Sequence, residues 1–379
     1  MSRLLRFLLE WFGVVLLTLV VAEVALRVVL DVKPLTPGQF LFEHDEVRGW
    51  RHRAGAKDLY VKLGCRQEIE INSLGLRERE IPHAPKIGTQ RILVVGDSQV
   101  VGFEVAQDET FTRVAERALH AAGYDVEIIN GGFRGYGTDQ VLLFLREEGL
   151  RYQPDLVLYH WGLNDPQDNM TLHRPFRKFS KGYFDLDPAG ALVLRGTPVV
   201  RHRQAVNVKV GPDGEPVEFE VSFKNRMMLS LRDLTVTRSS VATALANIVL
   251  VMPSFVQGLR GVAAYQDFEP ELDRSSRVYR VTEALVAAMG EEVEATGAEF
   301  RLLAASGPWG RTLHESLDLP RLGVAKRFAA SIPEGAELIV PFDSHLNALG
   351  HELFGEALAE SLIEADLVGV RGVADPEAS

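Results

Sequence analysis

Short apolar runs alternate with amphipathic segments from residue 91 onward. The first run, Ile92–Val95, is continuously apolar, as in a strand buried on both faces. Between Phe111 and Ala122 the apolar residues recur at helical spacing. Later patterns predict further strands at 126–129, 156–161, 300–304 and 338–340, and helices at 138–148, 277–296 and from about Asn347. This alternation predicts an α/β fold with a five-stranded parallel sheet covered by helices on both faces.

The N-terminal segment has a different pattern. Residues 11–22 are uncharged and apolar, and the apolar character continues to Leu30 with two charged interruptions. A spanning helix needs about 20 largely apolar residues, and Arg3 and Arg6 favour a cytoplasmic N-terminus. We therefore expect a transmembrane signal anchor at 7–30, with the catalytic part outside the cytoplasm, periplasmic or at the cell surface. A cleaved signal peptide and an amphipathic helix packed on the protein are the two other interpretations.

The rest of the chain is expected to divide into three parts. These are a linker with an extended lead-in at 31–90, the α/β domain at 91–365, and a C-terminal tail at 366–379. Residues from about 166 to 270 interrupt the strand–helix repeat and predict an insertion. Its first half, around 182–190 and 217–221, has the pattern of β-hairpins, and its second half, 226–260, has the pattern of helices.

Composition and charge exclude several classes of protein. With 379 residues, 46% hydrophobic and 25% charged, the chain is neither disordered nor fibrous. A net charge of −11 argues against a nucleic-acid partner, which would need a coherent basic face. The single cysteine, Cys65, excludes an intrachain disulfide and is expected to be a buried thiol. Because no His, Cys and carboxylate cluster has ligand spacing, no metal or other cofactor is expected.

Polar residues suited to acyl chemistry follow the ends of the predicted strands. Ser98 comes directly after the first strand, a glycine-rich segment at 130–137 follows the second, and Asn164 follows the third. Asp343 and His345 follow the last strand. The carboxyl ends of parallel strands share one edge, where open α/β sheets bind ligands. Acyl transfer at a serine needs a base, an acid that orients the base, and oxyanion donors. On its own, the Gly-Asp-Ser tripeptide also fits a turn that caps the next helix.

These segments together resemble the signature of the SGNH superfamily, also called the GDSL hydrolases. The matching blocks are Gly96-Asp97-Ser98 with Gly102, Asn130 to Gly135, Gly162-Leu163-Asn164-Asp165, and Asp343-Ser344-His345. The resemblance covers roughly residues 91–165 and 298–362, and it implies a flavodoxin-like three-layer α/β/α sandwich. It further implies a Ser98 nucleophile, a His345 base, an orienting acid Asp343, and oxyanion donors from the Ser98 N–H, the Gly135 N–H and the Asn164 side chain.

One spacing departs from the family pattern. The usual arrangement is Asp-x-x-His, whereas this chain has Asp343-x-His345. His351 is the alternative base, but it is expected about a turn into the last helix and facing elsewhere. Asp165 is expected to fix its loop rather than to serve as the triad acid.

The resemblance implies a serine esterase that hydrolyses acyl or acetyl esters, and the N-terminal pattern adds the expectation that it is anchored in a membrane. Its partner would be an ester substrate such as an acylated glycan or lipid. An alternative is an O-acetyltransferase that moves an acyl group through Ser98 onto an envelope or exported polysaccharide. A further alternative is a non-catalytic carbohydrate-binding protein on the same fold. The sequence leaves the substrate and the oligomeric state open.

Overall fold

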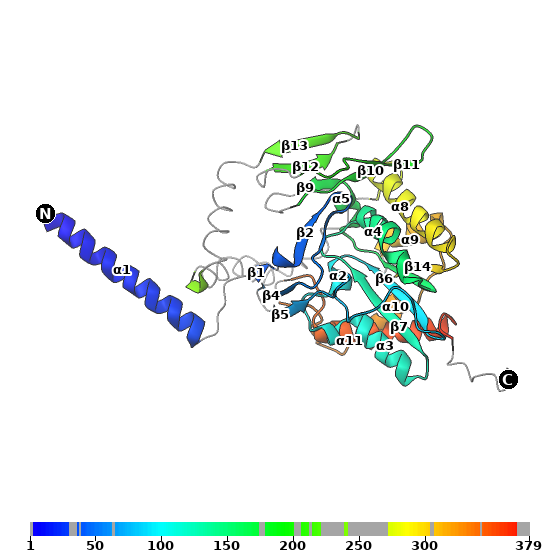
Figure 1. Cartoon of the computed structure of the whole chain (residues 1–379), viewed down its shortest axis with the longest axis horizontal. Coiled ribbons are helices and arrows are strands. Elements are labelled where there is room, and N and C mark those ends of the chain that lie inside the picture. Colours follow the sequence, from blue (N-terminus) through cyan, green and yellow to red (C-terminus); the bar gives the residue numbers. More distant parts are fainter. Residues whose placement is uncertain are drawn as a thin grey trace.

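The computed structural model describes most of the chain. The described residues are 3–29, 36–37, 39–62, 65–173, 179–200, 206–211, 214–220, 239–241, 272–303, 307–341 and 343–369. Figure 1 shows the α/β body with a long N-terminal helix extending from it.

A parallel sheet lies at the centre of the body. Its four strands are β6 (Gln90–Gly96), β7 (Val126–Gly132), β8 (Leu156–His160) and β14 (Glu299–Leu303). Their order across the sheet is β14-β8-β6-β7, and every neighbouring pair is parallel. The apolar run Ile92–Val95 is completely buried, which explains why the sequence shows no polar alternation there. The predicted parallel α/β sheet is confirmed.

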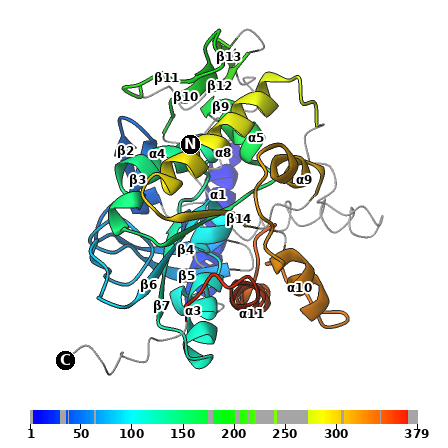
Figure 2. The same cartoon turned by 90° about the vertical axis from the view of Figure 1, so that its right-hand side faces the viewer.

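Helices cover both faces of this sheet (Figure 2). Ile92 and Val94 pack in a cluster with α3 (Phe111–Ala121) and α11 (Ala348–Glu364). Leu93 and Val95 pack in a second cluster with α4 (Thr138–Glu147) and α8 (Arg277–Glu294). Successive strand residues point to opposite faces, so one apolar run supplies both clusters. The shorter helices are α2 (Ser98–Val101), α5 (Asp165–Asn169), α9 (Gly307–Ser316), α10 (Val324–Ser331), η1 (Gln39–Leu41), η2 (Gln107–Glu109) and η3 (Gly149–Tyr152).

The strand predicted at 338–340 is wrong. Ile339 forms only an isolated antiparallel bridge with Leu346, and the segment does not pair with the parallel sheet. Its apolar character has another cause, because Val340 is 3% exposed and packs with Tyr60 in a cluster outside the main sheet. A run of three apolar residues does not distinguish a buried loop from a buried strand. Within the described residues, the parallel sheet therefore has four strands.

The lead-in segment packs against the body. It forms the strands β1 (Thr36–Pro37), β2 (Phe42–Asp45), β3 (Gly49–His52), β4 (Lys57–Lys62) and β5 (Cys65–Glu70), all in antiparallel pairs. The lead-in is extended as expected, and Cys65 at the start of β5 is buried as expected. The Trp50 ring lies 5.6 Å from that of Tyr136, whose hydroxyl donates to the Trp50 carbonyl at 2.5 Å. The lead-in thus shares the core of the sheet.

The first half of the predicted insertion forms β-hairpins, as expected. β10 (Tyr183–Leu186) pairs with β11 (Leu192–Arg195), and β12 (Val206–Val210) pairs with both β13 (Pro216–Glu220) and β9 (Thr171–His173). The helical segment predicted at 226–260 lies outside the described residues, apart from 239–241.

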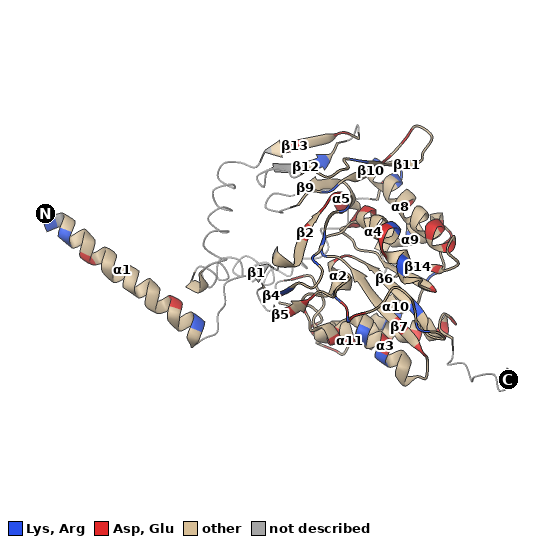
Figure 3. Cartoon of the chain, in the orientation of Figure 1, with Lys and Arg blue, Asp and Glu red and all other residues tan. Residues whose placement is uncertain are grey.

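The N-terminal helix α1 (Arg3–Val28) stands apart from the body (Figures 1 and 3). Its apolar part, Leu5–Val28, has a mean hydropathy of 2.1 and is not buried against the protein. Figure 3 shows its charged residues near the two ends and none along the middle. The helix is long and apolar enough to cross a membrane, as a membrane anchor or a signal sequence would be. The interpretation of a helix packed on the protein is wrong.

Among the histidines buried in the body, His52 and His351 are held as neutral rings. His52 Nδ1 lies 3.3 Å from the Gly75 carbonyl, and the ring stacks on Phe133 at 4.6 Å. His351 Nδ1 accepts a hydrogen bond of 3.1 Å from the Phe111 N–H. Burial lowers the pKa of each histidine to about 3, assisted at His351 by nearby Arg77.

We expect this burial to make the protein sensitive to acid. Each histidine must take up a proton on unfolding below about pH 6.5, so its contribution to stability is complete above that pH and is lost toward pH 3. Replacing His351 with Asn keeps an acceptor for the Phe111 N–H but removes the titrating ring. Urea unfolding of the full chain in detergent, measured at several pH values, should give an unfolding free energy whose pH slope is shallower by about 1.4 kcal/mol per pH unit. Equal slopes for the two proteins would contradict this account.

Candidate active site

Ser98 stands at the carboxyl end of β6, at the start of α2. The Asp97 carboxylate caps this short helix by accepting a 2.9 Å hydrogen bond from the Gln99 N–H. Gly102 ends it at φ +63°, a left-handed conformation that favours glycine. The capping turn that the Gly-Asp-Ser tripeptide suggested is therefore present. It places the serine at the sheet edge where open α/β folds bind ligands.

The end of β7 braces this turn. The Asn130 side chain donates to the Val100 carbonyl at 2.7 Å and accepts from the Gly132 N–H at 3.1 Å. A Cβ atom on Gly132 would lie 2.7 Å from the Val100 Cβ, which is too close for two carbon atoms. A glycine at this position lets β7 approach the serine turn closely.

Arg77 of the lead-in holds the same turn from the other side. Its guanidinium is buried and donates to the carbonyls of Val101 at 2.8 Å and Val105 at 2.6 Å, and also to that of Gly102. Burial lowers the pKa of Arg77 to about 10. One side chain far away in the sequence thus satisfies three buried carbonyl groups that follow the serine.

His345 and Asp343 lie in the loop before α11. The Val340 N–H donates to the His345 carbonyl at 2.9 Å, and the Asn347 N–H donates to the Leu338 carbonyl at 2.9 Å, so the loop folds back on itself. The Asn347 side chain then caps α11 by accepting from Gly350 at 2.9 Å. The loop is also tied to the serine turn, because the Gln99 side-chain amide donates to the Ser344 carbonyl at 3.1 Å.

Ser98, His345 and Asp343 form a continuous hydrogen-bonded chain. The Ser98 Oγ lies 2.8 Å from His345 Nε2, and His345 Nδ1 lies 2.5 Å from Asp343 Oδ1. A carboxylate can only accept, so the Nδ1 atom carries the proton and Nε2 presents its lone pair to the serine hydroxyl. The arrangement is suited to removing the Ser98 proton. The short Asp343-x-His345 spacing is compatible with this geometry because the loop turns back at that point.

Asn164 reaches the same edge from the end of β8. A methyl group on Gly162 would lie 2.9 Å from Asn164 Oδ1 and 3.3 Å from Asp97 Oδ2, so this loop packs against the residue before Ser98. The Asn164 amide donates to Asp168 Oδ2 at 2.7 Å. Asp165 accepts from the Gly162 N–H at 2.8 Å and from a buried tyrosine hydroxyl, and it fixes the loop as expected. Burial, reinforced by Asp97, raises the pKa of Asp165.

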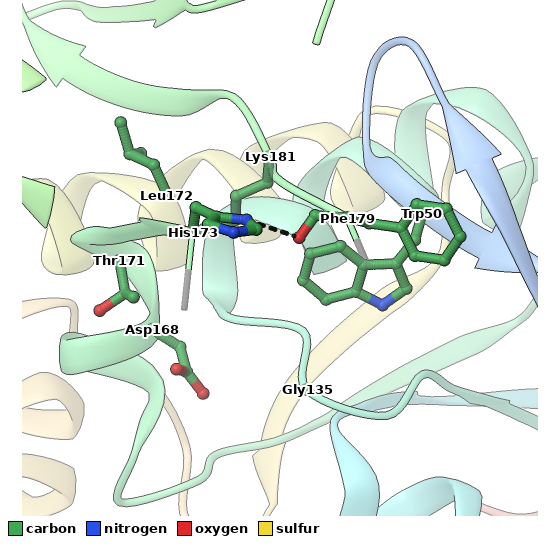
Figure 4. A pocket seen from close by; sticks show the side chains of 8 residues that line it. All are labelled: Trp50, Gly135, Asp168, Thr171, Leu172, His173, Phe179 and Lys181. Carbon is green, nitrogen blue, oxygen red and sulfur yellow. Dashed lines mark hydrogen bonds between the residues drawn. The ribbon is translucent and has the colours of Figure 1, made fainter. Parts of the chain in front are cut away.

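Gly135 borders a small hollow beside these residues (Figure 4). Its φ of +75° lies in the left-handed region that favours glycine. The Trp50 indole N–H donates to the Arg134 carbonyl at 3.3 Å and holds this loop against the lead-in. The hollow is lined by Trp50, Gly135, Asp168, Thr171, Leu172, His173, Phe179 and Lys181. Asp168, the partner of Asn164, thus faces the same space as Gly135.

His351 does not belong to the chain of Ser98, His345 and Asp343, because its Nδ1 atom accepts from the Phe111 N–H.

Two residues that the sequence did not point to lie next to His345. Glu104 Oε1 is 3.7 Å from His345 Nδ1, and Arg134 Nη1 is 2.9 Å from that same carboxylate oxygen. Their signal in the sequence is weak: Glu104 is a lone charge in an apolar stretch, and Arg134 precedes Gly135.

Among the described residues, Glu104, Asp343 and His345 also bring ligand atoms within 4.8 Å of one another. His345 Nδ1 is already bonded to Asp343, and Arg134 is paired with Glu104. We therefore assign no metal to this group.

Comparisons with known proteins give a partial picture. No family model matches the chain. An arylesterase from Vibrio mimicus is 34% identical over 77 residues, which is 20% of this chain and only 38% of that protein. A psychrotrophic esterase EstA from Pseudoalteromonas sp. covers 73% of this chain and 99% of its own, at 12% identity and a TM-score of 0.36. A lipase/acylhydrolase from Enterococcus faecalis covers 75% and 100%, at 14% identity and a TM-score of 0.35. These similar proteins are named as esterases or acylhydrolases.

We expect Arg77 to be a main support of the serine turn. Replacing it with Met keeps the length of the side chain and leaves three buried carbonyls without a donor, so the free energy of unfolding should fall by about 3 kcal/mol. Denaturant unfolding measures this loss. The control is Lys57→Gln, which breaks an exposed ion pair of the same segment and should cost less than about 1 kcal/mol. Equal losses in the two variants would contradict the supporting role.

Proposed function

We propose that this chain is a serine esterase of the SGNH type that hydrolyses acyl or acetyl esters. The observation that carries the proposal is the chain of hydrogen bonds from Ser98 Oγ through the His345 ring to Asp343. The partial match to an arylesterase and the esterases among the similar structures agree with it. The distances are those at which a serine, its base and an orienting acid work together.

The proposed reaction has two stages. His345 Nε2 takes the Ser98 proton while Oγ bonds to the ester carbonyl carbon, and Asp343 stabilises the resulting imidazolium. The imidazolium gives this proton to the departing alcohol, which leaves an acyl-Ser98. Water then attacks this acyl group as His345 takes one of its protons. Finally Ser98 leaves with that proton, and the free acid is released.

The oxyanion of each tetrahedral intermediate needs hydrogen-bond donors. We propose the Ser98 N–H, the Gly135 N–H and the Asn164 side-chain amide for this role. The Ser98 N–H lies at the start of α2, and the Asn164 amide is oriented by Asp168. The loop after β8 lies close to Asp97, which brings Asn164 near the serine turn. Such donors lower the barrier when they are fixed before the reaction begins.

We propose that α1 anchors the protein in a membrane and that residues 91–365 act outside the cytoplasm. An exposed apolar helix of this length is stable only when a lipid or another apolar surface covers it. The lead-in, 31–90, would then join the anchor to the catalytic domain. The substrate in this setting would be an ester on a glycan or lipid near the membrane.

Replacing Ser98 with Ala should abolish the activity. We expect the wild-type protein to react with a fluorophosphonate probe and to hydrolyse p-nitrophenyl acetate, and kcat/KM should fall by roughly 10³-fold or more in Ser98→Ala. Ser344→Ala is the matched control, because it removes a serine hydroxyl from the loop of the base without touching the nucleophile.

The enzyme proposal fails if the fluorophosphonate probe does not label the wild type and the wild type hydrolyses p-nitrophenyl acetate no faster than Ser98→Ala does. A carbohydrate-binding protein would then be the better description. Acetylation of an added glycan, in place of release of acetate, would turn the assignment from hydrolysis to O-acetyl transfer, which uses the same residues with a sugar hydroxyl as acceptor.

Asn164→Ala tests the oxyanion role. Because the amide is proposed to act on charge that develops in the transition state, kcat should fall by about 10²-fold while KM changes little. Gln167→Ala removes an exposed amide from the same short helix and should leave both constants unchanged. A rise in KM alone would assign Asn164 to ground-state binding of the substrate.

A further inference from the structure

A second carboxylate lies next to the base. The Glu104 side chain is fully buried, and its Oε1 atom is 3.7 Å from His345 Nδ1, the same nitrogen that bonds to Asp343. Glu104 follows the serine helix α2 by three residues, so the segment that carries the nucleophile also delivers this carboxylate. Asp343, in contrast, belongs to the loop that carries the base.

Two fixed groups hold Glu104 in place. Arg134 Nη1 lies 2.9 Å from Glu104 Oε1, and the Tyr60 hydroxyl donates to the same oxygen at 3.2 Å. Burial raises the pKa of Tyr60, so this hydroxyl keeps its proton and remains a donor. Burial works against the charge of Arg134, but Glu104, Tyr60 and Asp343 together outweigh this effect, and the pKa of Arg134 is raised. The Arg134 guanidinium also stacks on the Tyr60 ring at 5.1 Å.

We propose that Glu104 is a positioning residue that acts on His345 together with Asp343. This inference rests on the proposed function, because it concerns the imidazolium that forms when His345 takes the Ser98 proton. A buried carboxylate at 3.7 Å attracts that positive charge strongly, since little water screens it. Arg134 repels the same charge and partly cancels the attraction. The balance of Glu104 against Arg134 thus adjusts how readily the base accepts a proton.

Other charged and titratable groups face this cluster. Asp343 comes from the loop of the base, Tyr60 from β4, Arg77 from the lead-in, and His351 from α11. Variants that alter only Glu104 or Arg134 leave all of these groups in place. Single substitutions at these two positions therefore isolate the proposed effect.

The pH dependence of kcat/KM tests the proposal. With p-nitrophenyl acetate and the full chain in detergent, Glu104→Gln should keep an acceptor for Tyr60 and remove the negative charge. We expect the acid limb of the profile to move to lower pH by about one unit, with kcat/KM on the plateau lower by about tenfold. Arg134→Gln should move the limb in the opposite direction. Loss of packing alone would not produce shifts of opposite sign.

Controls separate this proposal from simpler explanations. Glu109→Gln neutralises an exposed carboxylate a few residues further along and should leave the profile unchanged. If Glu104→Gln fails to fold, Glu104→Asp keeps the charge and should retain the acid limb near its wild-type position even if turnover is slower. The pH dependence of Ser98 labelling by a fluorophosphonate gives a second measurement, because labelling needs the same proton transfer.

Two results would overturn the proposal. In the first, Glu104→Gln still hydrolyses the ester through Ser98, and the acid limb of its pH profile stays at the wild-type position. In the second, the acid limbs of Glu104→Gln and Arg134→Gln move in the same direction. Either result leaves the esterase assignment intact. If the wild type shows no Ser98-dependent hydrolysis at all, the proposed function itself fails, and this inference fails with it.

Discussion

Burial of the parallel strands on both faces is the constraint on which the rest of the structure depends. Their backbone groups pair with one another, and most of their side chains fill two apolar clusters. The residues proposed for catalysis therefore lie in the loops at the carboxyl edge. Ser98 follows β6, Gly135 follows β7 and Asn164 follows β8. Only the base arrives differently, on a loop that folds back on itself before α11.

The lead-in segment does more than connect the body to the N-terminal helix. Arg77 bonds to the carbonyls behind the serine, Trp50 bonds to the Arg134 carbonyl, and Tyr60 bonds to Glu104. Each contact reaches a different part of the candidate site. The geometry around Ser98 therefore depends on residues that lie outside the segment resembling the SGNH family.

The sequence was sufficient for those parts of the structure that local patterns determine. The strands β6 and β8 were predictable because their continuous runs of four apolar residues arise from burial on both faces. The strands β7 and β14 were predictable because their short apolar segments, each interrupted by one charged residue, alternate with segments of helical spacing. The place of Ser98 followed from its position after a predicted strand, whereas His345 was found from the family signature, since the strand predicted before it does not form. The roles of Gly135 and Asn164 in holding an oxyanion remain predictions. The apolar run at 338–340 was misleading, because three residues of a buried loop look the same as a short strand.

Arg77 and Glu104 could not have been found in this way. A buried charge is visible in a sequence only as a charge among apolar neighbours, and its partner is set by the tertiary fold. For Glu104 the partners Tyr60 and Arg134 lie on separate segments of the chain. Only the folded structure shows that these three side chains meet behind His345.

The hydrogen bond from the Gln99 side chain to the Ser344 carbonyl has a mechanical consequence. It joins the residue after the serine to the residue before the histidine, so the two halves of the proton-transfer pair are linked by a bridge much shorter than the chain between them. A displacement of one loop therefore acts directly on the other at the point where Oγ faces Nε2. This link holds side by side two atoms whose residues are 247 positions apart in the sequence.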